Sequence, residues 1–238
     1  MMASAPGYTR GIVYRNAPGL PFAVDFSRLP RRSVLQSVSQ KSVLVESLRR
    51  AYGEQMRSGN LLVPTEQILK HAGEAGVNLQ CLVSGKTLMD LGCGRERMLS
   101  SIAFARSLGA QNYIGIDVCF PDNPSALISQ LGITTTSNIG ILLIEANMPD
   151  FLQLVPTSSP VVAMMNLITG DKELYFPEGI SCAGFCTAVA GELTRVVQTG
   201  GIAFGRSSDT LSLLPSGNWH SKEEDGTIFA IRGQGIVH

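Results

Sequence analysis

The sequence predicts an α/β domain built on an open, mostly parallel sheet with helices on both faces. From residue 86 onward, short apolar runs alternate with stretches of helical spacing, and this alternation is typical of parallel strands joined by helices. One run ends in an acid followed by two glycines one residue apart, in the segment 90–94. Near the C-terminus two short strand candidates flank Glu224-Asp225-Gly226, a hairpin turn signal. We therefore expect the sheet to end in an antiparallel pair.

The individual elements follow from the hydrophobic periodicity. The strand candidates are 87–90, 112–118, 139–146, 161–166, 201–205, 219–222 and 227–232. The helix candidates between them are 96–108, 123–131 and 178–198. The last of these carries the clearest apolar stripe, and Gly200 and Gly201 stand where that helix should stop. A loop is expected over 207–218.

The N-terminal third has a different character. Residues 1–30 are rich in proline, glycine and aromatic residues without a period, which predicts an extended arm. Helical spacing returns over 32–58 and 65–76. We therefore divide the chain into an N-terminal arm and helical cap, residues 1–85, and the α/β domain, residues 86–238.

Length and composition exclude several classes of protein. The 238 residues suit one full α/β domain with an appendage. Basic and acidic residues are equal in number, 19 of each, so no global field attracts nucleic acid or an anionic membrane. No run of apolar residues is long enough to span a membrane, and the N-terminus lacks a secretory signal. The five cysteines have no paired-motif spacing, which predicts core residues in a reducing, cytoplasmic compartment and no metal site.

The segment 87–118 carries the strongest functional signal. Gly92 and Gly94 let the backbone approach a ligand closely because no Cβ intervenes. The following helix would present unpaired N–H groups to the same ligand. Asp117 ends the next strand, 23 residues beyond Gly94, and a carboxylate there can accept both hydroxyls of a ribose. This order predicts a site for a nucleoside-containing cofactor.

Two cofactors compete for such a site. A nicotinamide dinucleotide requires a third glycine, three residues after Gly94, which permits close packing above the pyrophosphate. That position is Arg97. S-adenosylmethionine has no phosphate and needs only a turn that admits its methionine half. Asp90, just before the turn, can hold the turn and face the ammonium group of this ligand. The sequence therefore favours S-adenosylmethionine.

These segments resemble a known family. Asp90-Leu91-Gly92-Cys93-Gly94 and Gly115-Ile116-Asp117-Val118 resemble motifs I and II of the class I S-adenosylmethionine-dependent methyltransferases. Arg195-Val196-Val197-Gln198-Thr199-Gly200-Gly201 resembles the helix end and turn before the fifth strand of that family. The resemblance covers residues 86–205, and the terminal hairpin agrees in order. It implies a Rossmann-like, seven-stranded sheet with an antiparallel C-terminal strand.

The resemblance also implies roles for single residues around the cofactor. Asp90 and the Gly92-Cys93-Gly94 turn would line the methionine end, Asp117 would bind the ribose, and Val118 would pack on the adenine. The chain departs from the family at Glu96, where a third glycine is common.

Further candidates lie at the ends of later strands. Ala146 and Asn147 follow the third strand, where the family commonly contacts the adenine. Asn166 follows the fourth strand, beside the methyl group and the acceptor pocket, and is a candidate for both cofactor binding and catalysis. His220, next to the single tryptophan, is a candidate general base.

The function that these observations favour is S-adenosylmethionine-dependent O- or N-methylation of a small or medium-sized acceptor. Residues 1–85 would lie on the substrate side. Protein or nucleic-acid acceptors stay open as alternatives. A rival from another class keeps the fold and the cofactor pocket without transferring methyl, as a partner subunit or in other chemistry. A second rival is a nicotinamide oxidoreductase, which Arg97 disfavours. No sequence feature predicts a membrane partner or specifies an oligomeric state.

Overall fold

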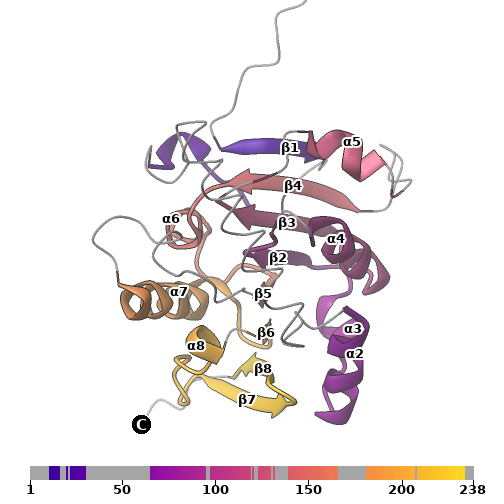
Figure 1. The fold of residues 1–238 in the computed structure, drawn as a ribbon. Coiled ribbons are helices and arrows are strands. Elements are labelled where there is room, and N and C mark those ends of the chain that lie inside the picture. Colours follow the sequence, from indigo (N-terminus) through magenta and orange to yellow (C-terminus); the bar gives the residue numbers. More distant parts are fainter. Residues whose placement is uncertain are drawn as a thin grey trace, which may run out of the picture.

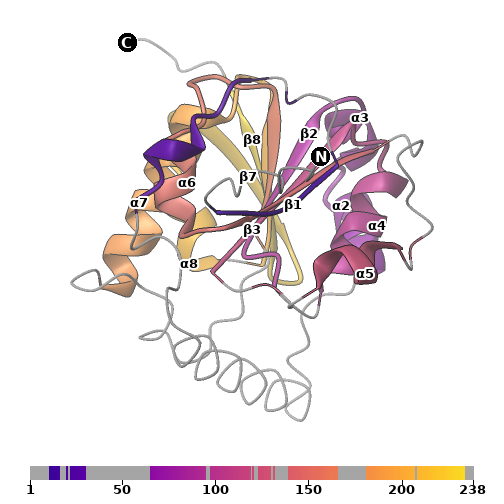
Figure 2. The ribbon, with the colours of Figure 1, turned by 90° about the horizontal axis from the view of Figure 1, so that it is seen from above.

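A mixed sheet of eight strands runs through the molecule, and helices cover both of its faces (Figure 1, Figure 2). The computed structural model describes residues 11–16, 20, 22–30, 65–94, 97–118, 120, 123–129, 131, 139–165, 181–206 and 208–233. The predicted α/β class is confirmed.

The strand order is β1-β4-β3-β2-β5-β6-β8-β7. In chain order the strands are β1 (Ile12–Asn16), β2 (Thr87–Leu91), β3 (Asn112–Asp117), β4 (Gly140–Glu145), β5 (Val161–Met165), β6 (Ile202–Gly205), β7 (Trp219–Glu224) and β8 (Thr227–Arg232). The five strands from β2 to β6 are parallel to one another. The last strand, β8, lies between β6 and β7 and is antiparallel to both, as the family resemblance implied.

Strand β1 makes the sheet one strand wider than the seven predicted. It lies within the segment expected to be an extended arm and pairs antiparallel with β4, with Tyr14 opposite Leu143. The register shifts between Ile12 and Tyr14. A five-residue strand with one irregularity is too short to show a period of two against its glycine- and proline-rich flanks, which is why the sequence indicated only extended chain.

One helical layer consists of α2 (Thr65–Glu74), α3 (Leu79–Val83), α4 (Met98–Ser107) and α5 (Pro124–Ser129). The other consists of α6 (Met148–Leu152), α7 (Cys182–Val196) and α8 (Ser208–Leu211), and Figure 2 shows the two layers on opposite sides of the sheet. The three short helices α3, α6 and α8 were not predicted because four or five residues do not establish a helical period. The predicted helix over 32–58 lies outside the described residues.

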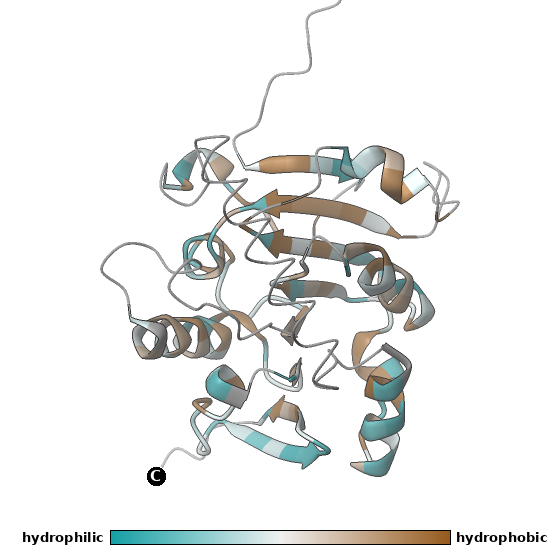
Figure 3. Ribbon diagram, in the orientation of Figure 1, coloured by the Kyte–Doolittle hydropathy of each residue, from teal (hydrophilic) through white to brown (hydrophobic). Residues whose placement is uncertain are grey.

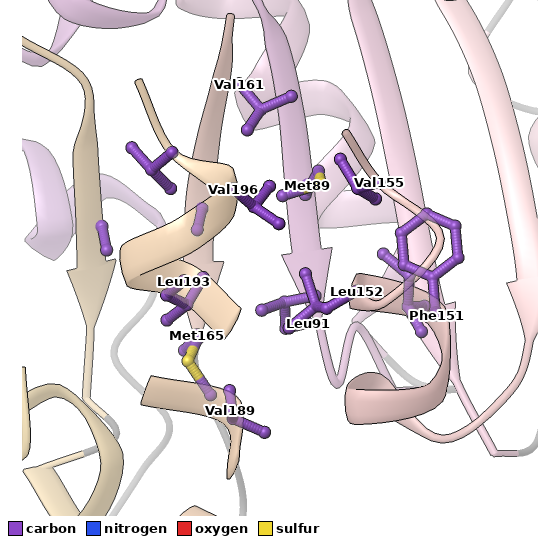
Figure 4. Close-up of a cluster of buried hydrophobic side chains, with 14 of the residues drawn as sticks. Met89, Leu91, Phe151, Leu152, Val155, Val161, Met165, Val189, Leu193 and Val196 are labelled. Atoms are coloured by element: carbon purple, nitrogen blue, oxygen red, sulfur yellow. The ribbon is translucent and has the colours of Figure 1, made fainter. Parts of the chain in front are cut away.

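The central strands are buried on both faces, and each face has its own apolar cluster. Met89 and Leu91 of β2 point toward α6 and α7, whereas Leu88 points toward α4. Figure 3 shows the inner strands as apolar and the edge strand β7 as polar. Figure 4 shows the cluster between α7 and the sheet, where Val189, Leu193 and Val196 face β2 and β5. This continuous burial explains why the parallel strands read as uninterrupted apolar runs.

The ends of α7 are set by local sequence. The Ser181 side chain accepts a hydrogen bond from the backbone N–H of Gly184 at 3.1 Å, so the helix begins at Cys182. The backbone turns extended at Val197, and Gly200 adopts a positive φ of +77°. The predicted helix is therefore confirmed, with an N-terminus later than residue 178.

Arg195, near the end of α7, ties this helix to the segment before β5. Its guanidinium donates to the carbonyl oxygen of Leu152 at 2.7 Å and to that of Val155 at 2.8 Å. Its Nε also donates to a carboxylate oxygen of Glu192 at 2.8 Å. One side chain thus binds two carbonyl groups at and just after the end of α6, and the Leu152 carbonyl also accepts from the backbone N–H of Val155.

Replacing Arg195 by methionine is expected to lower the free energy of unfolding by about 2 kcal/mol, because its charge-assisted hydrogen bonds to the two carbonyl groups and to Glu192 are lost. Urea denaturation measures this change. Arg106→Met, at an exposed arginine in the last turn of α4, is the matched control and should change stability by less than about 0.5 kcal/mol. Equal effects of the two substitutions would contradict the role assigned to Arg195.

Candidate functional site

The candidate site lies at the carboxyl edge of the parallel strands, where β2 and β5 are neighbours. The next described helix after β2 is α4, on one face of the sheet, and the next described helix after β5 is α7, on the other face (Figure 2). This reversal is a topological switch point, and open α/β sheets bind ligands in the crevice that it creates. The predicted glycine turn directly follows β2, so it lies at this switch point.

The turn is shaped by two glycines with positive φ. Gly92 has a φ of +77° and Gly94 a φ of +65°, values that other residues rarely adopt. The backbone N–H of Gly92 donates to the carbonyl oxygen of Ile116 at 2.8 Å. The turn after β2 is therefore fastened to the end of β3.

Asp117 is brought directly to the glycine turn. The backbone N–H of Gly94 donates to its Oδ2 atom at 2.8 Å, across 23 residues of sequence. Asp117, Val118, Gly92 and Gly94 are all partly exposed. They form an open surface on which a ligand can meet both the turn and the carboxylate.

The end of β4 lies beside Asp117. Glu145 is its partner in the register, and the N–H of Ala146 donates to the Asp117 carbonyl oxygen at 2.8 Å. Ala146 is fully buried, and Asn147 is nearly so and precedes α6 as its N-cap. The structure thus brings these two predicted residues to the edge next to Asp117, where they offer little surface of their own.

Asp90 lies beneath the turn, with its side chain fully buried. The hydroxyl of Tyr113 donates to Asp90 Oδ2 at 2.9 Å. The other oxygen, Oδ1, has no hydrogen-bond partner among the described residues. Ser101 of α4 faces the same carboxyl group without a bond of good geometry to Oδ1. Asp90 therefore supports the turn from inside and does not line the open surface.

Arg97 occupies the position where a dinucleotide site would have its third glycine. Its guanidinium donates to the carbonyl oxygen of Gly92 at 3.1 Å. It also lies close enough to Asp90 for its charge to act on that carboxyl group. The two residues before it, Arg95 and Glu96, are outside the described part of the chain.

The electrostatics of the buried groups distinguish their roles. Burial raises the pKa of Asp90 above its ordinary value, and the charge of Arg97 and the hydrogen bond from Tyr113 offset only part of this rise. Burial, with the charges of Asp117 and Asp90, holds the pKa of Cys93 well above its ordinary value. The Cys93 thiol therefore stays protonated and is not a nucleophile.

The raised pKa of Asp90 predicts a pH-dependent cost in stability. The folded protein holds the Asp90 proton more tightly than the unfolded chain, so the free energy of unfolding falls as the pH rises from about 3.8 through the folded-state pKa. The substitution Asp90→Asn removes this pH-dependent loss of stability. We expect the variant to gain stability relative to wild type between pH 4 and pH 8, as measured by urea denaturation at both values. Asp25→Asn, at an exposed aspartate whose pKa is lowered by hydrogen bonds from Ser27, should show the opposite trend. A constant difference between Asp90→Asn and wild type would contradict this prediction.

The two predicted catalytic residues have different outcomes. Asn166 lies outside the described residues; it follows Met165, which pairs with Leu91 and Gly205. His220 is paired with Ile231, which is also opposite Ile202, the first residue of β6. Because β7 and β6 run in the same direction, His220 lies at the amino edge of the sheet. His220 therefore lies at the edge of the sheet opposite the glycine turn and Asp117, and its role as a general base stays a prediction.

The structure also adds residues that the sequence reasoning missed. Tyr113 is one, because its role depends on the register between β2 and β3. A tyrosine inside a strand that is buried over most of its length was the available signal, since a buried hydroxyl needs a partner. Asp150 is another: it lies in the first turn of α6, and its Oδ2 is buried without a hydrogen-bond partner among the described residues.

Among the described residues, no three histidine, cysteine, aspartate or glutamate side chains are placed to hold a metal ion. Within the same residues, no helix has the length and apolar character needed to cross a bilayer.

Comparisons with known proteins give structural similarities only. No family model matches the sequence, and no curated protein matches it. A geranyl diphosphate C-methyltransferase from Streptomyces coelicolor, solved with Mg²⁺, geranyl diphosphate and S-adenosylhomocysteine, is 15% identical with a TM-score of 0.44, over 84% of this chain and 72% of that chain. A geranyl diphosphate methyltransferase solved with S-adenosylmethionine is 16% identical with a TM-score of 0.42, over 89% and 81%. A protein described as an rRNA methylase, from Clostridium thermocellum, is 13% identical with a TM-score of 0.44, over 69% and 97%. At such values a shared substrate does not follow.

Proposed function

We propose that this chain binds S-adenosylmethionine and transfers its methyl group to a small or medium-sized acceptor. The observation that carries the proposal is the hydrogen bond from the Gly94 N–H to Asp117 Oδ2. It unites an open glycine turn with a strand-end carboxylate at the switch point of the sheet, which is the arrangement that a nucleoside with a compact polar tail requires.

The residues present fit this cofactor. Asp117 is partly exposed and carries a carboxylate suited to ribose hydroxyls, and Val118 beside it offers an apolar surface for the adenine. Gly92 and Gly94 admit the methionine half. Below them, Asp90 Oδ1 is a buried carboxylate oxygen without a hydrogen-bond partner among the described residues. A buried acid in this state lowers stability, and support of the glycine turn that binds the cofactor accounts for its presence.

Arg97 supports S-adenosylmethionine over a nicotinamide dinucleotide. Its side chain lies against the turn and donates to the Gly92 carbonyl oxygen. A glycine at this position would leave the turn open for a pyrophosphate. The long side chain instead fills that space, which a cofactor without phosphate does not need.

Methyl transfer from this cofactor requires few catalytic groups from the protein. The bound cofactor supplies an electrophilic methyl group, so the residues of the chain need to orient an acceptor in line with it and exclude water. The residue after β5, Asn166, stays our prediction for the acceptor side. The substrate-side role of residues 1–85 and the cytoplasmic location stay predictions from the sequence.

Calorimetric titration of the full chain tests the proposal. S-adenosylmethionine and S-adenosylhomocysteine should both bind, and NAD should not. Transfer of labelled methyl from the cofactor is then measured with panels of small-molecule, RNA and protein acceptors. Binding of NAD alone would overturn the proposal. Cofactor binding without transfer to any panel would favour the rival in which the fold keeps the cofactor without methyl transfer.

A further inference from the structure

Tyr113 reaches Asp90 across a gap that a glycine leaves in the sheet. Asp90 lies opposite Gly115 in the register, not opposite Tyr113. A Cβ atom on Gly115 would lie 3.1 Å from Tyr113 Cε1 and 3.1 Å from Cys93 Sγ, closer than side chains tolerate without moving. The tyrosine ring therefore passes over Gly115, and its hydroxyl donates to Asp90 Oδ2 at 2.9 Å.

Asp90 and Arg97 continue this contact into the glycine turn. The charge of Arg97 acts on the Asp90 carboxyl group, and its guanidinium donates to the Gly92 carbonyl oxygen. Two residues further on, the Gly94 N–H donates to Asp117. Three hydrogen bonds, together with the interaction between the charges of Arg97 and Asp90, thus connect Tyr113 to the surface on which the cofactor is proposed to bind.

We propose that Tyr113 is a positioning residue for cofactor binding: it holds the Asp90 carboxylate in the orientation in which Asp90 and Arg97 together fix the glycine turn. This inference rests on the function proposed above. Tyr113 is fully buried, so it acts only through Asp90. Its hydroxyl is needed because a buried carboxylate that loses a hydrogen-bond donor is held less firmly in one orientation and favours its protonated form.

This role differs from simple core packing in its dependence on pH. Removing the hydroxyl removes a group that favours ionised Asp90, so the pKa of Asp90 rises further above its ordinary value. The other charged or titratable groups that face Asp90 among the described residues are Arg97 and Cys93. The guanidinium keeps its charge, and burial keeps the Cys93 thiol protonated. A change in binding between pH 6 and pH 8 that depends on position 113 therefore reports on Asp90.

The experiment is a double-mutant cycle measured by titration with S-adenosylhomocysteine at pH 6, 7 and 8. Tyr113→Phe should weaken binding by about 10-fold at pH 7, in line with the loss of one hydrogen bond to a charged group, and by more at pH 6. In the Asp90→Asn background the same change should weaken binding by less than about twofold, because the partner of the hydroxyl has already changed. Tyr14→Phe, at a partly buried tyrosine of β1, should leave affinity unchanged.

Each failure has a separate meaning. If the wild-type chain does not bind S-adenosylhomocysteine, the proposed function fails. If it binds and Tyr113→Phe binds equally well, or if the two losses simply add in the double variant, the positioning role is overturned. Should Tyr113→Phe fail to fold, 3-fluorotyrosine at position 113 keeps the ring and makes the hydroxyl a stronger donor. It should then strengthen binding at pH 6, and an unchanged pH profile overturns the inference.

Discussion

Replacing Asp117 by alanine is expected to weaken S-adenosylhomocysteine binding by about 100-fold. Hydrogen bonds to a charged group contribute about 1.5–3 kcal/mol each, and the proposed ribose contact uses this carboxylate. The substitution also leaves the Gly94 N–H without the acceptor that it has at 2.8 Å, so the glycine turn loses one of its attachments. Calorimetric titration at pH 7 measures the change in affinity.

A matched control distinguishes the loss of the proposed ribose contact from the general effect of removing an acidic side chain. Glu223→Ala removes an exposed carboxylate near the carboxyl end of the edge strand β7 and should leave affinity within about twofold of wild type, because it lies outside the proposed contact. Thermal unfolding should show Asp117→Ala to be folded. A folded Asp117→Ala variant with wild-type affinity would mean that the ribose lies elsewhere.

Gly205→Ala is expected to lower the free energy of unfolding by more than about 3 kcal/mol, at the upper end of the effects of single substitutions. Gly205 ends β6 with a φ of +140°, and a Cβ atom there would lie only 1.8 Å from the carbonyl oxygen of Met165. That contact is with backbone, so no side-chain rotation relieves it. Strands β5 and β6 would have to separate at the carboxyl edge, next to the position of Asn166.

Gly191→Ala is the matched control, because Gly191 lies on an exposed face of α7 and a Cβ there meets nothing within 4 Å. This substitution should raise the free energy of unfolding by about 0.5–1 kcal/mol through helix propensity. Urea denaturation of both variants measures these changes in the free energy of unfolding. A loss at Gly205 no larger than about 1 kcal/mol would show that the two strands move apart easily.

The parallel part of the fold could be predicted because burial on both faces makes each strand a continuous apolar run. The C-terminal hairpin could be predicted because Asp225 and Gly226 both adopt positive φ, of 46° and 70°, which the Asp-Gly pair favours. Strand β1 could not be predicted, because it forms by pairing with β4, a segment distant in the sequence. Hydrophobic periodicity shows which side of an element is buried, but it does not show which other element packs against that side.

In the candidate site, too, the residues found from the sequence are those placed by local spacing, and the others depend on contacts distant in the sequence. Gly92, Gly94 and Asp117 were found from local spacing, since a strand, a turn and a second strand place them together. Asp90 was identified from the sequence as a site residue, but its burial beneath the turn was not, because that burial depends on packing against α4. The position of His220 could not be predicted, because it follows from the direction of β7, which the direction of β8 fixes.

The pairing of β1 with β4 has a consequence for the order of folding during synthesis. Residues near Ile12 leave the ribosome before their partners near Ile144, which follow more than one hundred residues later. Chains fold from the N-terminus as they emerge, and contacts between distant segments form slowly. Strand β1 must therefore wait, unpaired with β4, until β4 has been made. A ribosome-bound chain that stops before residue 140 should accordingly leave residues 11–16 open to protease, and release of the complete chain should protect them.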